Sequence, residues 1–421
     1  MQINELIKGF DCACGKHHSC DIKHVLIGSG VIDGLTGITQ EYQTILLVAD
    51  ENTFAAAGAQ TEAALAGKDI RKVIFSGKTV LIPNEAAIEK VNENMAGTQL
   101  IIGIGSGVIQ DLCKYVSFFS SVPYYVVATA PSMDGYTSTG AAMILGGMKE
   151  TVSAKVPEAI IADTKVLKDA PMEMIRAGYG DIVGKFSALN DWRLSHVVNG
   201  EYLCPYIYDL TMEMVEKTLR LADGLQKREE ESVGVLMEAL IVVGIAMSFA
   251  GSSRPASGSE HHLSHFFEIT GIVHGEEYFP HGIDVAYSTV ITAALRQRLL
   301  KECWTGEQHR PKRDYYEAEM DRIYGSVGSS CVALQDKMGR YAQEMVPVYL
   351  EKEAQIREIL EQMPSATKIK QMLAAVGLDM EEFYKLYSPE KIKDAVIWAK
   401  DLKDRYTVLW MYFDLFGGQP L

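Results

Sequence analysis

The stretch QLIIGIGSGVIQDLCKY, residues 99–115, joins an apolar run of strand type directly to a helical segment. Gly103, Gly105 and Gly107 lie where the strand would end and the helix would begin. Glycines allow backbone amides to approach a pyrophosphate, and the positive end of a helix favours its charge. The spacing departs from the standard dinucleotide fingerprint, so a simple tight turn is the alternative interpretation.

Similar apolar runs, rich in valine and isoleucine, lie on both sides of this stretch and are separated by helical or turn segments. They occupy residues 24–32, 44–51, 72–77, 123–129 and 159–163. Short apolar strands that alternate with helices predict a parallel, doubly wound sheet.

The periodicity changes after Asp163, and the rest of the chain is almost entirely helical in pattern, for example over 208–226, 231–250 and 389–417. We therefore expect an α/β domain with a Rossmann-like sheet over residues 1–165. An all-α domain should follow over residues 166–421. No low-complexity linker separates the two, so we expect them to share a cleft.

The whole-chain properties exclude several classes of function. The 421 residues carry a net charge of -15, and no basic stripe is visible for a nucleic-acid surface. The most apolar run, 236–251, contains Glu238 and is short for a membrane span, so it indicates a buried helix. The N-terminal residues show no secretory signal, and seven cysteines fit reduced thiols. These features favour a cytoplasmic protein without a membrane partner.

The N-terminal sequence CACGKHHSC, residues 12–20, groups three of the cysteines. Cys12, Cys14, His17 and Cys20 have the right atoms for a small tetrahedral zinc site. The spacing matches no standard zinc finger, and a reduced cluster on a loop is the preferred interpretation.

A second group of metal-binding residues comes from GYGDIVGKFSALNDW (178–192), GSEHHLSH (258–265) and FPHGIDVA (279–286). Asp181, His261 and His281 offer one carboxylate and two imidazoles, which leaves coordination positions open for a substrate oxygen. His265 follows His261 by one helical turn, and Lys185 follows Asp181 by the same interval, so Lys185 is expected beside the metal or its ligand. This pattern predicts a catalytic divalent-metal site.

Two further segments follow predicted strands, where open α/β sheets bind ligands. Asp50 ends the predicted strand TILLVAD, residues 44–50. A carboxylate there accepts hydrogen bonds from an adenosine ribose and repels a 2′-phosphate, which favours NADH; a helix cap is the alternative. The segment 128–143 contains Thr129, Ser132, Asp134 and Ser138 in a turn-rich sequence.

Six of these motifs together resemble the sn-glycerol-1-phosphate dehydrogenases, particularly their bacterial branch, in the superfamily of glycerol dehydrogenase, iron-dependent alcohol dehydrogenase and dehydroquinate synthase. They are GIGSGVIQD (103–111), TAPSMDGYTS (129–138), AGYGDIVGK (177–185), DWRLSH (191–196), SSRPASGSEHHLSH (252–265) and PHGIDVA (280–286). The resemblance spans nearly the whole chain and includes the cysteine-rich start and RYTVL (405–409). It implies a dehydroquinate synthase-like fold.

The resemblance also implies an activity: reversible reduction of dihydroxyacetone phosphate by NAD(H) or NADP(H) to sn-glycerol 1-phosphate, in phospholipid metabolism. It implies a homodimer that holds one divalent metal ion, nickel or zinc, on Asp181, His261 and His281. The residues matching the coenzyme site are Asp50, Gly105, Ser106, Gly107, Asp111, Thr129, Ser132 and Ser138. Asp134 matches a substrate-side catalytic aspartate, and His265 matches the second histidine of a paired motif near the reacting oxygen.

Some residues remain open to two interpretations. Arg254 is expected to clamp a substrate phosphate with its planar fork, and a structural or surface role is the alternative. His274 begins HGEE, which resembles the third-ligand motif of glycerol dehydrogenases, and His262 is an additional candidate. His281 is preferred because apolar residues follow it, as on a buried helix. A glycerol dehydrogenase, a dehydroquinate synthase-like enzyme, and a non-catalytic metal- and nucleotide-binding protein are the alternative functions.

Overall fold

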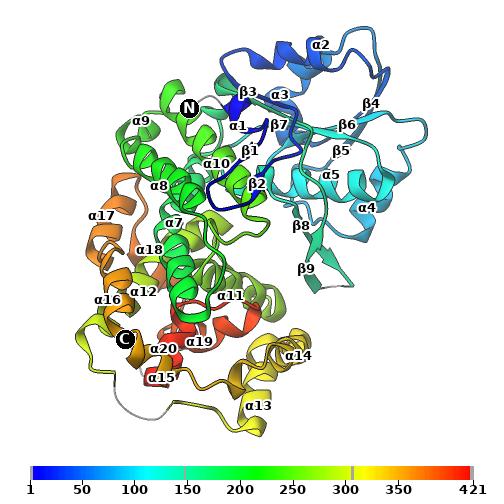
Figure 1. The fold of residues 1–421 in the computed structure, drawn as a ribbon. Helices are drawn as coiled ribbons and strands as arrows, with labels where there is room; N and C mark the ends of the chain where they lie inside the picture. The colour runs from blue at the N-terminus through cyan, green and yellow to red at the C-terminus, as the bar shows by residue number, and fades with distance from the viewer. Residues whose placement is uncertain (1–2, 147, 305–307, 418–421) are drawn as a thin grey trace. The chain divides into compact units, whose positions relative to one another are not determined.

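The computed structural model describes residues 3–146, 148–304 and 308–417. It contains a parallel sheet and many helices (Figure 1), which confirms the predicted fold class. The strands are β1 Phe10–Asp11, β2 His17–His18, β3 His24–Gly28, β4 Thr44–Asp50, β5 Asp69–Phe75, β6 Leu100–Gly105, β7 Tyr124–Ala128, β8 Gly140–Leu145, β9 Met148–Ser153 and β10 Ala159–Asp163.

The helices up to residue 250 are α1 Ile3–Leu6, η1 Val31–Gly34, α2 Leu35–Ile38, α3 Glu51–Ala64, α4 Glu85–Asn92, α5 Gly107–Ser120, η2 Asp134–Thr137, α6 Thr164–Leu167, α7 Met172–Asn199, α8 Pro205–Leu219, α9 Ala222–Gln226 and α10 Glu230–Ala250. Those that follow are α11 Ser259–His274, α12 His281–Lys301, α13 Arg313–Tyr324, η3 Gly325–Val327, α14 Gly328–Met338, η4 Arg340–Ala342, α15 Val346–Glu351, α16 Glu353–Glu361, α17 Ala366–Ala375, α18 Met380–Leu386, α19 Pro389–Trp398, η5 Ala399–Leu402 and α20 Val408–Phe416.

The chain forms two compact units. Unit 1 consists of Met1–Tyr179 and Glu216–Ser253, and unit 2 consists of Gly180–Val215 and Arg254–Leu421. The last strand of the sheet ends at Asp163, close to the predicted boundary at 165. However, the later segment Glu216–Ser253 also belongs to the unit that carries the sheet. A single boundary along the chain does not describe these units, and the domain limits 1–165 and 166–421 stay a prediction.

The main sheet of unit 1 has six parallel strands in the order β3-β10-β7-β6-β4-β5. Side chains alternate between its two faces: Ile45 and Leu47 of β4 pack with α3 on one face, and Leu46 and Val48 pack with α4 and α5 on the other. The order of the strands reverses between β4 and β6. The next strand in the chain after β4, which is β5, lies on one side of this pair, and the strand after β6, which is β7, lies on the other side. This is the position where doubly wound sheets bind ligands.

Helix α10 matches the helical pattern that the sequence shows over 231–250. It runs from Glu230 to Ala250, with a hydropathy of 2.2 that by composition alone would permit a membrane span. However, 72% of that window is buried inside the structure, which is the pattern of a core helix. In unit 1, Thr137 of η2 donates a hydrogen bond to the Ile241 carbonyl of α10, so this helix supports the loop after β7.

One buried carboxylate fixes the relative positions of four helices in unit 2. Asp191 of α7 accepts hydrogen bonds from Arg296 of α12 at 2.7 Å and from the backbone amides of Ser259 and Val408 at 2.6 and 2.9 Å. These amides are at the first turns of α11 and α20, whose N–H groups otherwise lack partners. Both Asp191 and Arg296 are buried. Their ion pair therefore holds α7, α11, α12 and α20 in one arrangement.

We predict that Asp191→Asn destabilises unit 2 by about 3–5 kcal/mol, because it leaves the buried Arg296 guanidinium without a counter-charge. All four tryptophans of the chain, Trp192, Trp304, Trp398 and Trp410, belong to unit 2, so their fluorescence during urea unfolding reports on this unit. The exposed Asp209→Asn on α8 serves as the matched control and should leave the midpoint unchanged. Equal midpoints for the two variants would contradict the role given to Asp191.

Candidate metal centre and coenzyme-binding region

Three helices of unit 2 bring Asp181, His261 and His281 together. One ligand atom from each residue lies within 4.8 Å of the others. Asp181 and His261 are buried, and His281 is partly exposed. One carboxylate and two imidazoles are ligands that first-row divalent metals accept, and three protein ligands leave coordination positions open. The residues present therefore fit a catalytic metal ion.

Small residues beside Asp181 allow the ligand-bearing helices to approach closely. A Cβ atom at Gly180 would lie 2.6 Å from the Gly282 carbonyl oxygen of α12. A Cβ atom at Gly184 would lie 2.5 Å from Val285, also on α12. Larger residues would push α12 away from α7. The glycines therefore explain how an aspartate on one helix meets a histidine at the start of the other.

Hydrogen bonds orient both imidazoles so that Nε2 is available to a metal ion. Glu260 accepts a hydrogen bond from Nδ1 of His261 at 2.7 Å, and the Gly258 amide donates to the same carboxylate oxygen at 2.8 Å. The Ser264 hydroxyl lies 3.3 Å from Nδ1 of His281. A carboxylate behind a metal-ligating histidine fixes the ring and its tautomer. The sequence interpretation missed Glu260, whose place next to His261 in the chain does not reveal this contact.

Charge around the site determines the protonation of its ligands. Burial raises the pKa of Asp181, but the Lys185 ammonium, followed by smaller effects of His261 and His281, outweighs it and lowers the pKa to about 2. The Lys185 ammonium donates to Oδ1 of Asp181 at 2.6 Å, as the helical spacing predicts. Burial also lowers the pKa of His261 well below its usual value, and the charge of Lys185 adds to this effect. Asp181 is thus an anion and His261 a neutral ligand at neutral pH.

The remaining histidines of the motif lie in three different settings. His265 is adjacent to the cluster, with its ring centre 5.5 Å from that of His281 and 6.1 Å from that of His261. His262 is fully buried, and neither of its ring nitrogens has a hydrogen-bond partner among the described residues. His274 is at the C-terminal end of α11, where Nε2 donates to the Ile323 carbonyl at 2.9 Å. The structure therefore groups His281, and not His274, with Asp181 and His261.

Asp50 is both at the end of β4 and at the start of α3. One carboxylate oxygen, Oδ1, accepts hydrogen bonds from the backbone amides of Asn52 and Thr53 at 2.8 and 2.9 Å, which is a helix cap. No hydrogen bond joins the other oxygen, Oδ2, to a described residue. Asp50 is therefore the N-cap of α3 in the structure. Binding of an adenosine ribose through Oδ2 stays a prediction.

The glycine-containing turn follows β6, the strand next to β4. Gly105 ends β6, Ser106 is the N-cap of α5, and Gly107 begins that helix. A Cβ atom at Gly105 would lie 2.6 Å from Cβ of Ile109, which shows how tightly the turn closes. The backbone amide of Thr129, after β7, donates to the Gly105 carbonyl at 3.2 Å. The ends of β4, β6 and β7 thus place three predicted coenzyme-binding segments along one edge of the sheet.

A buried lysine that the sequence interpretation missed joins two of these segments. Lys114 of α5 donates to the Gly140 carbonyl at 2.8 Å, to Ser138 at 3.3 Å and to Asp111 at 3.5 Å. Burial lowers the pKa of Lys114, and the charge of Asp111 partly offsets this. Ser132 and Asp134 lie buried in the same loop. Lys114 therefore fixes the positions of Asp111 and Ser138, whose contacts to a coenzyme stay a prediction.

Arg254 is buried in unit 2 and already has a carboxylate partner. Its Nε donates to Glu201 at 2.6 Å, and Nη2 donates to the same carboxylate and to the Tyr406 carbonyl at 2.9 Å. The planar fork is thus used in a bidentate ion pair, which gives Arg254 a structural role. A contact between Arg254 and a substrate phosphate stays a prediction.

The ligand set predicts the effects of two histidine substitutions on metal affinity. His281→Ala should weaken binding of nickel or zinc by more than about 100-fold, since it removes a ligand, whereas loss of an outer hydrogen bond costs about 10–100-fold. His274→Ala should leave the affinity unchanged, because this ring is hydrogen-bonded to the Ile323 carbonyl and is not grouped with Asp181, His261 and His281. Isothermal titration calorimetry with nickel or zinc measures the metal affinity of both variants. Loss of affinity in His274→Ala alone would assign the third ligand to that residue.

The chain is similar to known oxidoreductases in both sequence and fold. The profile of the iron-containing alcohol dehydrogenases matches residues 27–171. The chain is 30% identical to a glycerol-1-phosphate dehydrogenase (NAD(P)+) of Geobacillus stearothermophilus, over 96% of both chains. It is 31% identical to the enzyme of that name from Geobacillus thermodenitrificans, over 86% of both.

Among solved structures, an iron-containing alcohol dehydrogenase from Thermococcus thioreducens has a TM-score of 0.63 at 14% identity, over 96% of this chain and 100% of that one. This likeness confirms the fold alone. The two Geobacillus relatives carry the family assignment, because each covers more than two thirds of the chain at 30% identity or above. The chain belongs to the glycerol-1-phosphate dehydrogenase family of NAD(P)-dependent oxidoreductases.

Proposed function

We propose that this protein reduces dihydroxyacetone phosphate with NADH or NADPH to sn-glycerol 1-phosphate, reversibly, with one divalent metal ion, nickel or zinc. The observation that carries the proposal is the meeting of Asp181, His261 and His281 within 4.8 Å in unit 2. The names of the Geobacillus relatives support the reaction and the coenzyme.

The residues around the ligands support carbonyl reduction. When bound, the ion polarises the carbonyl oxygen of the substrate as a Lewis acid. Asp181 and His261 supply one negative and one neutral ligand, so the site keeps net positive charge for that oxygen. Hydride comes from the nicotinamide, and the reduced oxygen then needs one proton. His265, one helical turn from His261, is proposed to deliver this proton directly or through water, because imidazole titrates near neutral pH.

Positive charge near the histidines supports a phosphorylated substrate. Burial lowers the pKa of His262 well below its usual value, and the charges of Lys403, Arg405 and Arg254 lower it further. Lys403 also acts on the ligand His261. A phosphate dianion needs charge-assisted hydrogen bonds of the kind that lysine and arginine donate. We propose Lys403 and Arg405 for this role, together with the Arg254 already predicted.

Buried polar atoms in the same region support the proposed phosphate position. Nη1 of Arg405 and both ring nitrogens of His262 are buried without a hydrogen-bond partner among the described residues. Buried polar atoms in native proteins nearly always have a partner, which a ligand or water can supply. An anion bound between these residues would accept hydrogen bonds from Nη1 of Arg405 and from the one ring nitrogen of His262 that carries a proton.

The other parts of the proposal rest on sequence and on relatives. Asp50 is proposed to bind the adenosine ribose, and the turn 105–107 with Asp111 to bind the pyrophosphate. Thr129, Ser132, Asp134 and Ser138 are proposed to surround the nicotinamide and the substrate. A cytoplasmic homodimer that needs no membrane or nucleic-acid partner is the proposed state.

The alternative reactions on this scaffold differ in substrate and in coenzyme turnover. A glycerol dehydrogenase would use an unphosphorylated triol, and a dehydroquinate synthase-like enzyme would show no net consumption of NADH. A non-catalytic homologue would bind metal and nucleotide without turnover. The positive charge around His262 favours a phosphorylated substrate over the unphosphorylated triol of a glycerol dehydrogenase.

The substrate is tested by steady-state NADH oxidation with dihydroxyacetone phosphate and with dihydroxyacetone, on nickel- or zinc-loaded protein. We expect kcat/KM to be at least about 100-fold higher for the phosphorylated ketone, with kcat also higher, since binding energy of a remote phosphate helps to orient the carbonyl. Chiral analysis of the product should give sn-glycerol 1-phosphate.

The phosphate contact is tested in the same assay with Lys403→Met. This variant should lower kcat/KM for dihydroxyacetone phosphate by about 10-fold or more and leave dihydroxyacetone unaffected. The exposed Lys385→Met, whose lysine pairs with Glu382, is the control. Equal efficiency on both ketones in the unaltered protein would indicate a glycerol dehydrogenase, and a glycerol 3-phosphate product would refute the proposed stereochemistry.

The coenzyme preference is tested with Asp50→Asn, which removes the negative charge but retains a good N-cap residue for α3. We expect the ratio of kcat/KM for NADPH to that for NADH to rise about 10-fold, because repulsion of the 2′-phosphate is lost. Asp33→Asn, an exposed acid of the same unit, is the control. If the ratio stays constant, Asp50 serves only as a helix cap.

A further inference from the structure

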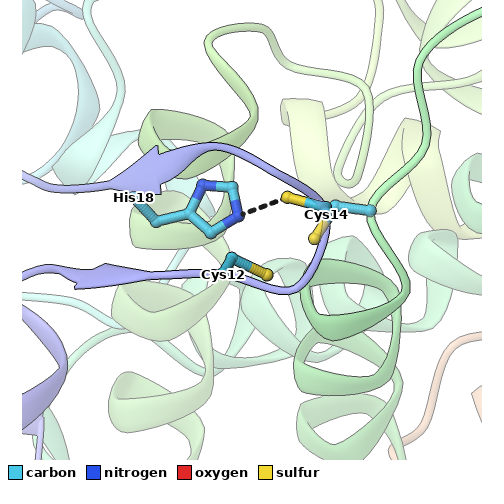
Figure 2. Close-up of side chains that lie close together, drawn as sticks. Cys12, Cys14 and His18 are labelled. Carbon is cyan, nitrogen blue, oxygen red and sulfur yellow. Dashed lines mark hydrogen bonds between the residues drawn. The ribbon is translucent and has the colours of Figure 1, made fainter.

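A second group of metal-binding atoms lies in the N-terminal hairpin of unit 1. Figure 2 shows the thiols of Cys12 and Cys14 beside the imidazole of His18, and their ligand atoms lie within 4.8 Å of one another. We propose that these three residues bind a zinc ion that stabilises the hairpin, independently of the site at Asp181. The proposed reduction reaction does not require this ion.

The backbone of the hairpin holds both cysteines in one tight turn. Strands β1 and β2 pair antiparallel, and the Cys12 amide donates to the Lys16 carbonyl at 3.0 Å. The Gly15 amide then donates back to the Cys12 carbonyl at 2.9 Å. Gly15 has a φ of 84°, a left-handed conformation that favours glycine. The turn thus keeps the two cysteines close together.

His18 presents the correct nitrogen to the sulfur atoms. Its Nδ1 lies 3.0 Å from the Phe249 carbonyl oxygen of α10, and a carbonyl can only accept, so Nδ1 carries the proton. The lone pair is therefore on Nε2, which lies 3.4 Å from Sγ of Cys14. A ligating histidine that donates its other N–H to a backbone carbonyl is a common arrangement in zinc sites.

The ring of His18 is also fixed by packing. It is fully buried and stacks on Phe249 with 5.5 Å between ring centres, while Phe10 contacts it edge-on at 5.5 Å. A ring held in this way keeps Nε2 directed at the thiols. An ion bound there would connect the hairpin to α10 through His18.

The separations suit a tetrahedral zinc ion. Bond lengths of about 2.3 Å to sulfur and about 2.0 Å to nitrogen, at a tetrahedral angle, place the two ligand atoms about 3.5 Å apart. The distance of 3.4 Å between Cys14 and His18 matches this value. Two thiolates and an imidazole are soft and borderline ligands, which select zinc over magnesium or calcium. A water molecule or a further thiol would complete the four ligands, and binding releases the thiol protons.

This ligand set corrects the sequence interpretation, which grouped His17 and Cys20 with the two cysteines. His17 is exposed and pairs with Asp11 at 2.9 Å. Successive residues of a strand point to opposite faces, so only one of the two adjacent histidines can face inward, and it is His18. Burial raises the pKa of the Cys20 thiol, which disfavours the thiolate that binds metal.

Cobalt(II) substitution distinguishes this site from the one at Asp181. Reduced, metal-free full-length protein is titrated with cobalt(II), and absorption from thiolate-to-cobalt charge transfer is recorded in the near ultraviolet. The Asp181, His261 and His281 site contains no sulfur and cannot produce this signal. We expect one equivalent of cobalt to produce the band, zinc to displace it, and total metal to reach two ions per chain.

Single substitutions identify the ligands. Cys12→Ser and Cys14→Ser should each weaken zinc binding at this site by about 100-fold or more and abolish the band, while one ion per chain remains. His17→Ala and Cys303→Ser are the controls, since both residues are exposed, and they should keep the band. The serine variants retain the size of the side chain, and circular dichroism checks their fold. His18→Ala should behave as the cysteine variants do.

Three results would overturn the proposal. The first is the absence of a charge-transfer band in folded, reduced protein at excess cobalt. The second is a band of full intensity in the Cys12→Ser/Cys14→Ser double variant. The third is a disulfide between Cys12 and Cys14, detected by mass spectrometry, in protein purified without oxygen. None of these results depends on whether dihydroxyacetone phosphate is a substrate.

Discussion

Unit 2 depends on the matching of buried carboxylates with buried positive charge. An ionised carboxylate in the protein interior is costly unless it is paired and fully hydrogen-bonded. Asp191 meets this requirement through Arg296 and two backbone amides. Asp181, ten residues earlier on α7, meets it through Lys185. Asp191 fixes the first turns of α11 and α20, and its ion pair with Arg296 holds α12 against α7. The pair of Asp181 and Lys185 is part of the candidate metal centre that α11 and α12 complete.

This arrangement sets the protonation states of two of the candidate metal ligands. Asp181 stays ionised because the Lys185 ammonium and, to a smaller extent, the nearby imidazoles lower its pKa to about 2, and His261 stays neutral because burial lowers its own pKa. Both are the protonation states that metal binding requires. Lys185 supplies positive charge beside Asp181 when no ion is bound. The open coordination positions and the partly exposed His281 then leave room for a substrate oxygen.

The sequence predicted local features well and long-range contacts poorly. The six strands follow from short apolar runs, and the grouping of Asp181, His261 and His281 follows from motifs that each lie within one short segment. The roles of Glu260, Lys114 and Asp191 depend on hydrogen bonds to their surroundings, which spacing along the chain does not encode. The choice between His17 and His18 depended on strand register, which a two-residue strand does not reveal in the sequence.

The central claim is that Asp181, His261 and His281 hold a divalent ion. The most direct measurement is an anomalous-difference map, at the nickel absorption edge, from crystals of nickel-loaded protein with dihydroxyacetone phosphate reductase activity. We expect a peak within bonding distance of the Asp181 carboxylate and of one ring nitrogen each of His261 and His281. Active, nickel-loaded crystals with no peak at these residues, or with a peak at His274 instead, would contradict the account.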